Sequence, residues 1–402
     1  MSDNVNASYD SLPDEIVTQI LLHLPIKSII TCTSVSKTWK SIIQNPTFIS
    51  IHLHLSIKSN NNLNFLTLFT PQNKEVYALH SDDDDDFTEH TRFDFPHKPI
   101  NSKIIFRVVG ICNGLVCISD DLHGNTNQLF LWNPCVRKFV KLPLPNVTCQ
   151  LGKKHGSIGF GFDAKTNDYK VARVVYLEVD PNILKERPKV EVYSLSTSEW
   201  RIITAALPPI CTLNLIEGRE PQAFVNGAIH WIAFRGTGGV RLGAFVLVFD
   251  LGDEVFREIP LPKLPNYNPQ ECRNDLCAYG NSIALFQTVF VDSRHLDIWV
   301  MKEYGVSSSW TKVLTLAAQV RILPRGLPLP PIPRAIGFKR NGKVVLDMGW
   351  RISMGMGMLT SQDLETQEKK DLQITSYYCT FVDSYVESLI LLDKVANGAV
   401  TY

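Results

Sequence analysis

Few residues in this 402-residue chain have the types and spacing that catalytic or metal chemistry requires. Two pairs of cysteines are each five residues apart, and neither pair has a histidine at an offset typical of zinc: Cys112 with Cys117, and Cys272 with Cys277. His52 and His54 alternate with apolar residues, which predicts one face of a strand or loop. Two histidines without a third ligand are more often surface residues. The sequence therefore predicts no metal, no cofactor and no catalytic residues.

Other candidates for chemistry have structural interpretations. No glycine-rich loop follows a strand and opens a helix, so a nucleotide phosphate site is not predicted. The acidic run Asp82–Asp86 is typical of a solvated loop. Six tryptophans are better explained by packing between repeated units than by a ligand cage, and these are Trp132, Trp200, Trp231, Trp299, Trp310 and Trp350.

Charge and cysteine content limit the classes of partner. Lys+Arg and Asp+Glu balance at 40 each, so no net field favours nucleic acid or an anionic membrane. Nine scattered cysteines without a CxxC pair are typical of a reducing compartment. The N-terminus lacks the basic start and apolar run of a signal peptide, and no run approaches the roughly 18 apolar residues of a membrane span. We expect a soluble protein in the cytoplasm and/or nucleus, without nucleic-acid or membrane partners.

The elements that could position a site begin with residues 11–50. Apolar residues recur there every four positions, at Leu12, Ile16, Ile20 and Leu24. This spacing predicts an amphipathic helix that Pro25 ends. Residues 26–30 suggest a second helix, and residues 35–43 a third that ends before Asn45-Pro46. Three short helices cannot bury this much apolar surface alone, so they need a partner protein or the downstream domain.

A series of short motifs runs from Leu12 to Ile49: Leu12-Pro13, Ile20-Leu21, Leu24-Pro25, Ser28-Ile29, Val35-Ser36-Lys37, Trp39, and Pro46 with Phe48. This residue order resembles the F-box. The sequence departs from that family's pattern at Thr31, a position that is usually Arg, and at Ser34, one that is usually Cys. F-box proteins bind a Skp-type adaptor, and we expect these two departures to weaken that contact.

The rest of the chain contains a repeated β pattern. An aromatic residue, a polar turn and a second apolar residue seven positions later recur at Trp132 with Phe139, Tyr193 with Trp200, and Phe249 with Phe256; Trp299 with Trp310 repeats this in a longer hairpin. Second hairpins lie between these copies, several of them with Asn-Gly turns. Four strands per repeat predict a β-propeller blade. We count five blades between about residues 104 and 374.

Closure of the propeller involves both ends of the β region. The apolar run 383–392 is expected to pair with strands at 63–80 and complete a sixth blade, because closure removes exposed sheet edges. A pair of β-sandwiches is the competing architecture. The segments 113–120, 131–143, 159–175, 191–201 and 385–392 resemble the plant F-box-associated domain, which is often described as kelch-like and occurs in S-locus F-box proteins.

The expected fold class is mainly β with a small all-α N-terminal module, a three-helix F-box followed by a six-bladed β-propeller. The expected domains are a disordered N-terminus (1–10), the F-box (11–50), a connector (51–62), the propeller closed by N- and C-terminal strands (63–395) and a tail (396–402).

The resemblance implies a function as the substrate-recognition subunit of an SCF-type (Skp-cullin-F-box) ubiquitin ligase. The F-box would bind a Skp-type adaptor and through it cullin, while the propeller holds a protein target for ubiquitination and proteasomal degradation. Pistil ribonucleases and immune receptors are the target classes implied by the relatives. The expected adaptor-binding residues are Leu12, Pro13, Ile16, Ile20, Leu21, Leu24, Pro25, Ser28, Ile29, Val35 and Trp39.

Two other functions remain open from the sequence. One is a stand-alone protein- or glycan-binding propeller whose N-terminal helices act only as a structural cap. The other is an enzyme on a propeller scaffold, which would need carboxylates and arginines that converge on one face. A failure to bind a Skp-type adaptor would favour the stand-alone propeller over the ligase subunit. A cluster of carboxylates and arginines on one face would favour the enzyme.

Overall fold

The computed structural model describes residues 12–59, 63–69, 74–81, 87–97, 106–121, 128–147, 154–177, 188–204, 211–213, 222–235, 242–263, 268–291, 294–318, 331–349, 357–376 and 380–394. The expected disordered N-terminus (1–10), the tail (396–402), the run Asp82–Asp86 and Trp350 lie outside these residues.

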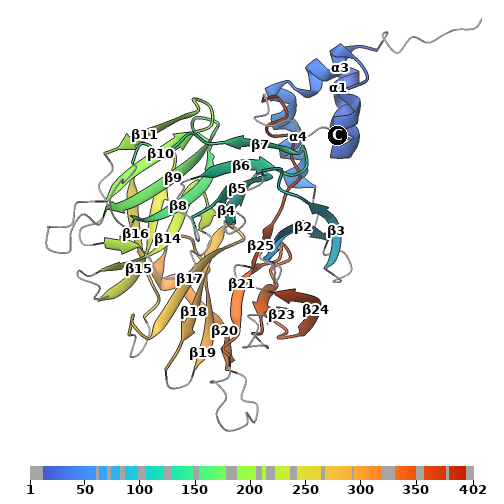
Figure 1. The fold of residues 1–402 in the computed structure, drawn as a ribbon. Helices are drawn as coiled ribbons and strands as arrows, with labels where there is room; N and C mark the ends of the chain where they lie inside the picture. The colour runs from blue at the N-terminus through green and yellow to red at the C-terminus, as the bar shows by residue number, and fades with distance from the viewer. Residues whose placement is uncertain are drawn as a thin grey trace, which may run out of the picture.

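Four helices form the N-terminal module, one more than the sequence predicted (Figure 1). They are α1 (Asp14–Leu22), α2 (Ile26–Cys32), α3 (Lys37–Ile43) and α4 (Pro46–Lys58). The fourth begins where the third was expected to end, because Asn45-Pro46 also starts a helix. The Asn45 side chain accepts a hydrogen bond from the Thr47 N–H at 2.8 Å, and Pro46 is the first helical residue. His52 and His54 therefore lie on a helix, and the expected strand or loop was wrong.

Six antiparallel sheets follow, as expected for a six-bladed propeller. Blades 1 to 3 contain β4 (Arg107–Cys112), β5 (Leu115–Ser119), β6 (Leu129–Asn133) and β7 (Lys138–Lys141); β8 (Lys154–Asp163), β9 (Asp168–Leu177), β10 (Lys189–Ser194) and β11 (Glu199–Ile203); and β12 (Cys211–Leu213), β13 (Ala223–Val225), β14 (Ala228–Arg235), β15 (Gly243–Asp250) and β16 (Phe256–Pro260).

The remaining three blades complete the ring. They contain β17 (Cys272–Tyr279), β18 (Ser282–Val289), β19 (His295–Met301) and β20 (Trp310–Ala317); β21 (Arg334–Phe338), β22 (Val344–Asp347), β23 (Gly357–Gln362) and β24 (Lys369–Ser376); and, in blade 6, β25 (Phe381–Ser384), β1 (Leu63–Phe69), β2 (Glu75–Ser81) and β3 (Thr88–Phe93). A short 3-10 helix, η3 (Ser307–Ser309), precedes β20.

The ring closes as predicted, with a C-terminal strand paired to β1, but that strand overlaps only the start of the predicted run 383–392. β25 pairs with β1 in blade 6, from Asn64 opposite Ser384 to Thr67 opposite Phe381. Only residues 383 and 384 of the predicted run 383–392 belong to β25. The continuation of the strand to Leu392 was wrong, since the chain leaves the sheet after the Tyr385 N–H donates to the Leu63 carbonyl at 2.9 Å. Leu391 has a positive φ of 73°, which a continuous strand does not permit. This apolar run packs under the helices instead.

The repeated aromatic pattern marks the hairpin between the third and fourth strands of a blade. Trp132 lies opposite Phe139, and Tyr193 opposite Trp200, as their spacing suggests. Blade 4 differs, because Trp310 lies opposite Met301 and not Trp299. The longer turn with η3 and a bulge between Ile298 and Trp299 shift the register.

The core is divided among the interfaces between neighbouring blades, where six apolar clusters follow one another around the ring. Tryptophan side chains connect these interfaces, as predicted. The Nε1–H of Trp200 in blade 2 donates to the Pro143 carbonyl beside blade 1 at 2.8 Å, and Trp310 in blade 4 donates to Pro260 of blade 3 at 3.0 Å. Each indole thus buries its ring and satisfies its polar group.

The glycines of the GFGFD segment make room for blade 3. A Cβ at Gly161 would collide with the ring of Phe224, and one at Gly159 would collide with the side chains of Ile229 and Trp231. Neither glycine has the positive φ that would itself require Gly. The close approach of two blades is therefore the reason for glycine at both positions.

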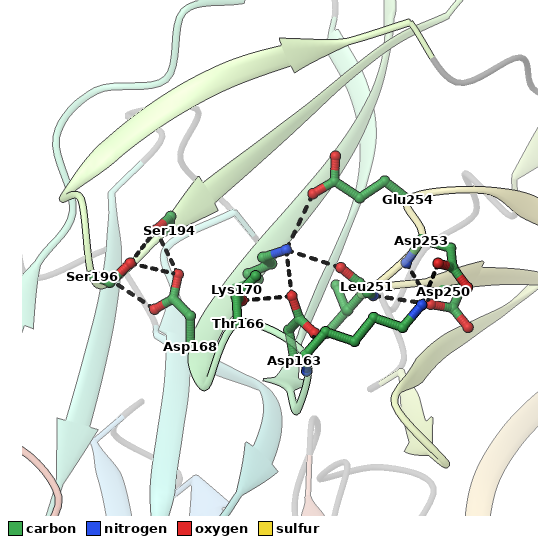
Figure 2. Close-up of polar contacts among 12 residues, drawn as sticks. Asp163, Thr166, Asp168, Lys170, Ser194, Ser196, Asp250, Leu251, Asp253 and Glu254 are labelled. Carbon is green, nitrogen blue, oxygen red and sulfur yellow. Dashed lines mark hydrogen bonds and ion pairs between the residues drawn. The ribbon is translucent and has the colours of Figure 1, made fainter.

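A buried polar network joins blades 2 and 3 at the turns that follow β8 and β15 (Figure 2). The Lys170 ammonium lies 2.7 Å from an Asp163 carboxylate oxygen and 3.2 Å from one of Glu254, and it donates to the Leu251 carbonyl at 3.0 Å. Burial would raise the pKa of Asp163, but hydrogen bonds from Lys170 and Thr166 outweigh it and keep that pKa below its ordinary value. The Lys170 ammonium has three N–H groups and three acceptors within hydrogen-bond distance, so we interpret the network as structural.

Candidate adaptor-binding surface

The exposed face of α1 carries an apolar stripe. Leu12, Ile16 and Ile20 are four residues apart and expose 44%, 47% and 51% of their surface. Ile16 and Ile20 lie one turn apart on α1, and Leu12 lies two residues before its first residue, Asp14. All three side chains face water. The opposite face of α1, with Val17 and Leu21, is buried. An apolar stripe exposed on a helix that is already packed on its other side is typical of a protein-binding surface.

The predicted adaptor-binding residues do not form one surface. Seven are exposed: Leu12, Pro13, Ile16, Ile20, Pro25, Ser28 and Val35. Leu24 and Trp39 are partly buried, whereas Leu21 and Ile29 have no exposed surface and belong to the core between the helices. The apolar pattern combined two faces, because a helix in a small bundle buries one side in its own core and presents another to a partner. Direct contact with an adaptor remains a prediction for the exposed residues.

The core of the helical module extends into the propeller. Its apolar cluster includes Val136 from the turn after β6, and Leu389 and Leu392 from the run that follows β25. Leu389 is fully buried, and Leu392 exposes 4% of its surface. The helices are therefore packed on blade 1 and on the end of the chain.

Residues 385–394, named the C-terminal segment below, are held on blade 1 by side chains that donate to their backbone carbonyls. The Asn133 amide nitrogen donates to the carbonyls of Ser388 and Ile390, each at 2.9 Å. The Lys138 ammonium donates to the carbonyls of Leu392 and Lys394, each at 2.8 Å. These side-chain donors thus pair four carbonyls of the segment that have no strand ladder.

Contacts at either end of the helical module fix its orientation. The Gln44 amide after α3 donates to the Leu392 carbonyl at 3.3 Å. Arg340, in the turn between β21 and β22, donates to the Ile57 carbonyl near the end of α4 at 3.4 Å and to the Tyr385 carbonyl at 3.5 Å. Its N–H also donates to the Asn64 side chain at 2.9 Å. The sequence analysis did not identify Gln44 or Arg340. The apolar run 385–392 was the one feature in the sequence that could have pointed to this junction.

Two side chains capable of chemistry, Cys112 and His230, are buried in the core. In the described part of the chain, no group of three or more His, Cys, Asp or Glu side chains could hold a metal ion. Burial raises the pKa of the Cys112 thiol to about 12, so it is unreactive at neutral pH. Burial lowers the pKa of His230 to about 4, and its two ring nitrogens contact the Ala223 carbonyl and the Tyr304 hydroxyl. This histidine is a core residue.

None of the helices described here has the length and apolarity that crossing a membrane would require.

Comparisons with known proteins agree with this architecture. Residues 10–50 match the F-box domain, and residues 66–392 match the F-box associated beta propeller domain. F-box protein At3g07870 of Arabidopsis thaliana is 30% identical over 92% of this chain and 88% of its own length. F-box protein CPR1 of the same plant is 26% identical over 95% and 89%, and F-box/kelch-repeat protein At3g23880 is 24% identical over 76% and 79%.

Proposed function

The chain belongs to the F-box proteins that carry an F-box-associated β-propeller domain, and on this basis we propose that it is the substrate-recognition subunit of an SCF-type ubiquitin ligase. The helices bind a Skp-type adaptor, which connects to cullin, and the propeller binds the protein to be ubiquitinated and degraded. The chain itself supplies proximity between that target and the ubiquitin-conjugating enzyme, so it needs no catalytic residue. This function operates in the cytoplasm and/or nucleus.

The exposed stripe of α1 is the observation that carries the adaptor contact. Its three apolar side chains, Leu12, Ile16 and Ile20, each keep about half of their surface in water. Covering them with an apolar groove contributes roughly 25 cal/mol per Å². The buried opposite face of α1 keeps the stripe rigid, so little conformational entropy is lost on binding.

The rigid attachment of the helices supports the second half of the proposal. Ubiquitin transfer by proximity requires a defined distance between adaptor and target. The shared core with Leu389 and Leu392 and the hydrogen bonds of Arg340 favour a single orientation of the helices on the propeller.

The target is expected at the end of the propeller that faces away from the helices. β25 runs toward the C-terminal segment, so first and second strands meet on the helix side, through short turns such as Asn113–Gly114, Asn226–Gly227 and Gly280–Asn281. The second strands end on the opposite side, for example β9 at Leu177 and β14 at Arg235. Loops held by a rigid scaffold are the usual location of recognition residues.

The adaptor contact is tested with charged substitutions in the stripe. The double variant Ile16→Asp, Ile20→Asp should bind a purified Skp-type adaptor more than tenfold more weakly, because it buries two carboxylates against an apolar surface. The matched control is Ile51→Asp, Leu55→Asp, an i, i+4 pair on α4 with 41% and 38% exposure. Both variants should melt like the wild-type chain. Wild-type adaptor binding by the α1 variant would contradict the proposed contact.

The shared core also favours a second candidate function. Since the helices pack on blade 1 and the C-terminal segment, they could act as a structural cap of a stand-alone protein- or glycan-binding propeller. If this second function is right, the wild-type chain does not bind the adaptor, and neither double variant binds it.

A further inference from the structure

A groove separates the helical module from the propeller on one side of their junction. It lies between α2, β3 and the turn that follows β6, and its volume is about 530 Å³. Ile30 of α2, Phe93 of β3 and Pro134 of the turn contribute apolar surface to it. This volume and its position between two domains are typical of a binding site.

The groove is predominantly basic. Lys27, Arg92 and Arg137 line it, against a single carboxylate from Glu387. Arg92 is engaged by Glu89, whose carboxylate oxygen lies 2.7 Å from its Nη2. Within the described part of the chain, the Lys27 ammonium has no carboxylate partner. The charge of the groove therefore complements an acidic ligand.

One wall of the groove is a sheet edge. β3 is the last strand of its sheet, whose order is β25-β1-β2-β3, and Thr91, Arg92 and Phe93 of this strand line the groove. An outer strand offers backbone N–H and C=O groups to another extended chain. This favours an extended peptide over a compact small molecule.

The two departures from the F-box pattern lie at the same place. Thr31 and Ser34 both line the groove. Their hydroxyls donate to backbone carbonyls of α2, from Thr31 to Lys27 at 3.0 Å and from Ser34 to Thr31 at 2.6 Å. These small side chains turned back on their helix leave the groove open.

We propose that this groove binds an extended acidic peptide segment of the target protein as an added strand on β3. The segment places an acidic side chain toward Lys27, and the apolar residues of the groove contact its aliphatic side chains. The inference rests on the proposed function, because it names a second contact of the same target close to the adaptor.

The test uses the full chain and a fluorescein-labelled hexapeptide, Asp-Val-Asp-Leu-Asp-Val, in fluorescence anisotropy. This peptide should bind at least tenfold more tightly than one with Lys in place of every Asp. Lys27→Glu should weaken binding at least tenfold, whereas Lys58→Glu, with the same charge change at an exposed position outside the groove, should not. Thr31→Trp should also weaken it, because the indole fills the groove without changing its charge.

Two further measurements separate strand addition from simple charge attraction and from adaptor binding. The same peptide N-methylated at alternate amides should lose binding, since it keeps its charge but cannot form a ladder. Equal binding of the methylated peptide, or an unchanged affinity in Lys27→Glu, would overturn the proposal. Competition by saturating adaptor would overturn it too, because the groove would then belong to the adaptor interface. Adaptor binding measured on the same variants tests the proposed function independently.

Discussion

The buried leucines of the C-terminal segment should hold the helical module on the propeller. Leu389 is fully buried among the helices, while Leu391, two residues later, is 1% exposed and belongs to the cluster between blades 1 and 2. Leu389→Ala should therefore loosen the helices, and Leu391→Ala should perturb the two blades. The pair is matched in residue type, burial and position in the chain.

The magnitude follows from the cavity that each substitution leaves. A buried Leu→Ala change costs about 2–5 kcal/mol, depending on how far the site relaxes. If the whole cost falls on the detachment of the helical module, the equilibrium constant for its opening rises by about 30-fold to several thousand-fold, since 1.4 kcal/mol is a factor of ten.

Hydrogen–deuterium exchange with mass spectrometry measures this equilibrium segment by segment. In Leu389→Ala, amides of α1 to α3 should exchange faster by that factor, and amides of β8 to β11 should change much less. In Leu391→Ala the order should reverse. If the helical amides of Leu389→Ala exchange as in the wild-type chain, the helices do not depend on the C-terminal segment, and the inferred rigid attachment is refuted.

Three further predictions concern packing and charge. Gly161→Ala should lower the free energy of unfolding by about 1–3 kcal/mol in thermal melts, because its Cβ meets the Phe224 ring, whereas Gly243→Ala, with nothing within 4 Å, should be neutral. Leu21→Ala should cost about 2–5 kcal/mol of helical stability, measured by circular dichroism, because the side chain is fully buried. Burial raises the pKa of Asp383 to about 6, above its unfolded value near 4, so the folded state loses stability as pH rises from about 4 to 6. Asp383→Asn should then raise the melting temperature at pH 7.5, by an effect of up to about 3 kcal/mol, and leave it nearly unchanged at pH 4.

The elements whose contacts are local follow from the sequence. The four-residue spacing of Leu12, Ile16 and Ile20 predicts a helix, and the seven-residue spacing of Trp132 and Phe139 predicts a hairpin whose aromatic residues face each other. Six blades follow for the same reason, since each sheet except the closing one is built from consecutive strands. Patterns within one element or one hairpin contain the information that determines them.

The division of apolar residues between surfaces depends on tertiary contacts. Leu21 and Ile20 are neighbours in the sequence and both fit the helical pattern, yet Leu21 is fully buried and Ile20 is 51% exposed. Periodicity identifies which residues share a face of α1. Which face the other helices cover depends on how the bundle packs.

The conformation of the run 385–392 depends on contacts with residues that are even farther away in the sequence. Its apolar residues fit a strand buried on both faces equally well, and only the folded chain places Leu389 and Leu392 among the helices. The hydrogen bond from Gln44 to the Leu392 carbonyl spans 348 positions. Burial of an apolar residue is favourable in either environment, since the hydrophobic effect has no direction. The choice between them is made by backbone partners such as Asn133 and Lys138, whose positions the ring of blades determines.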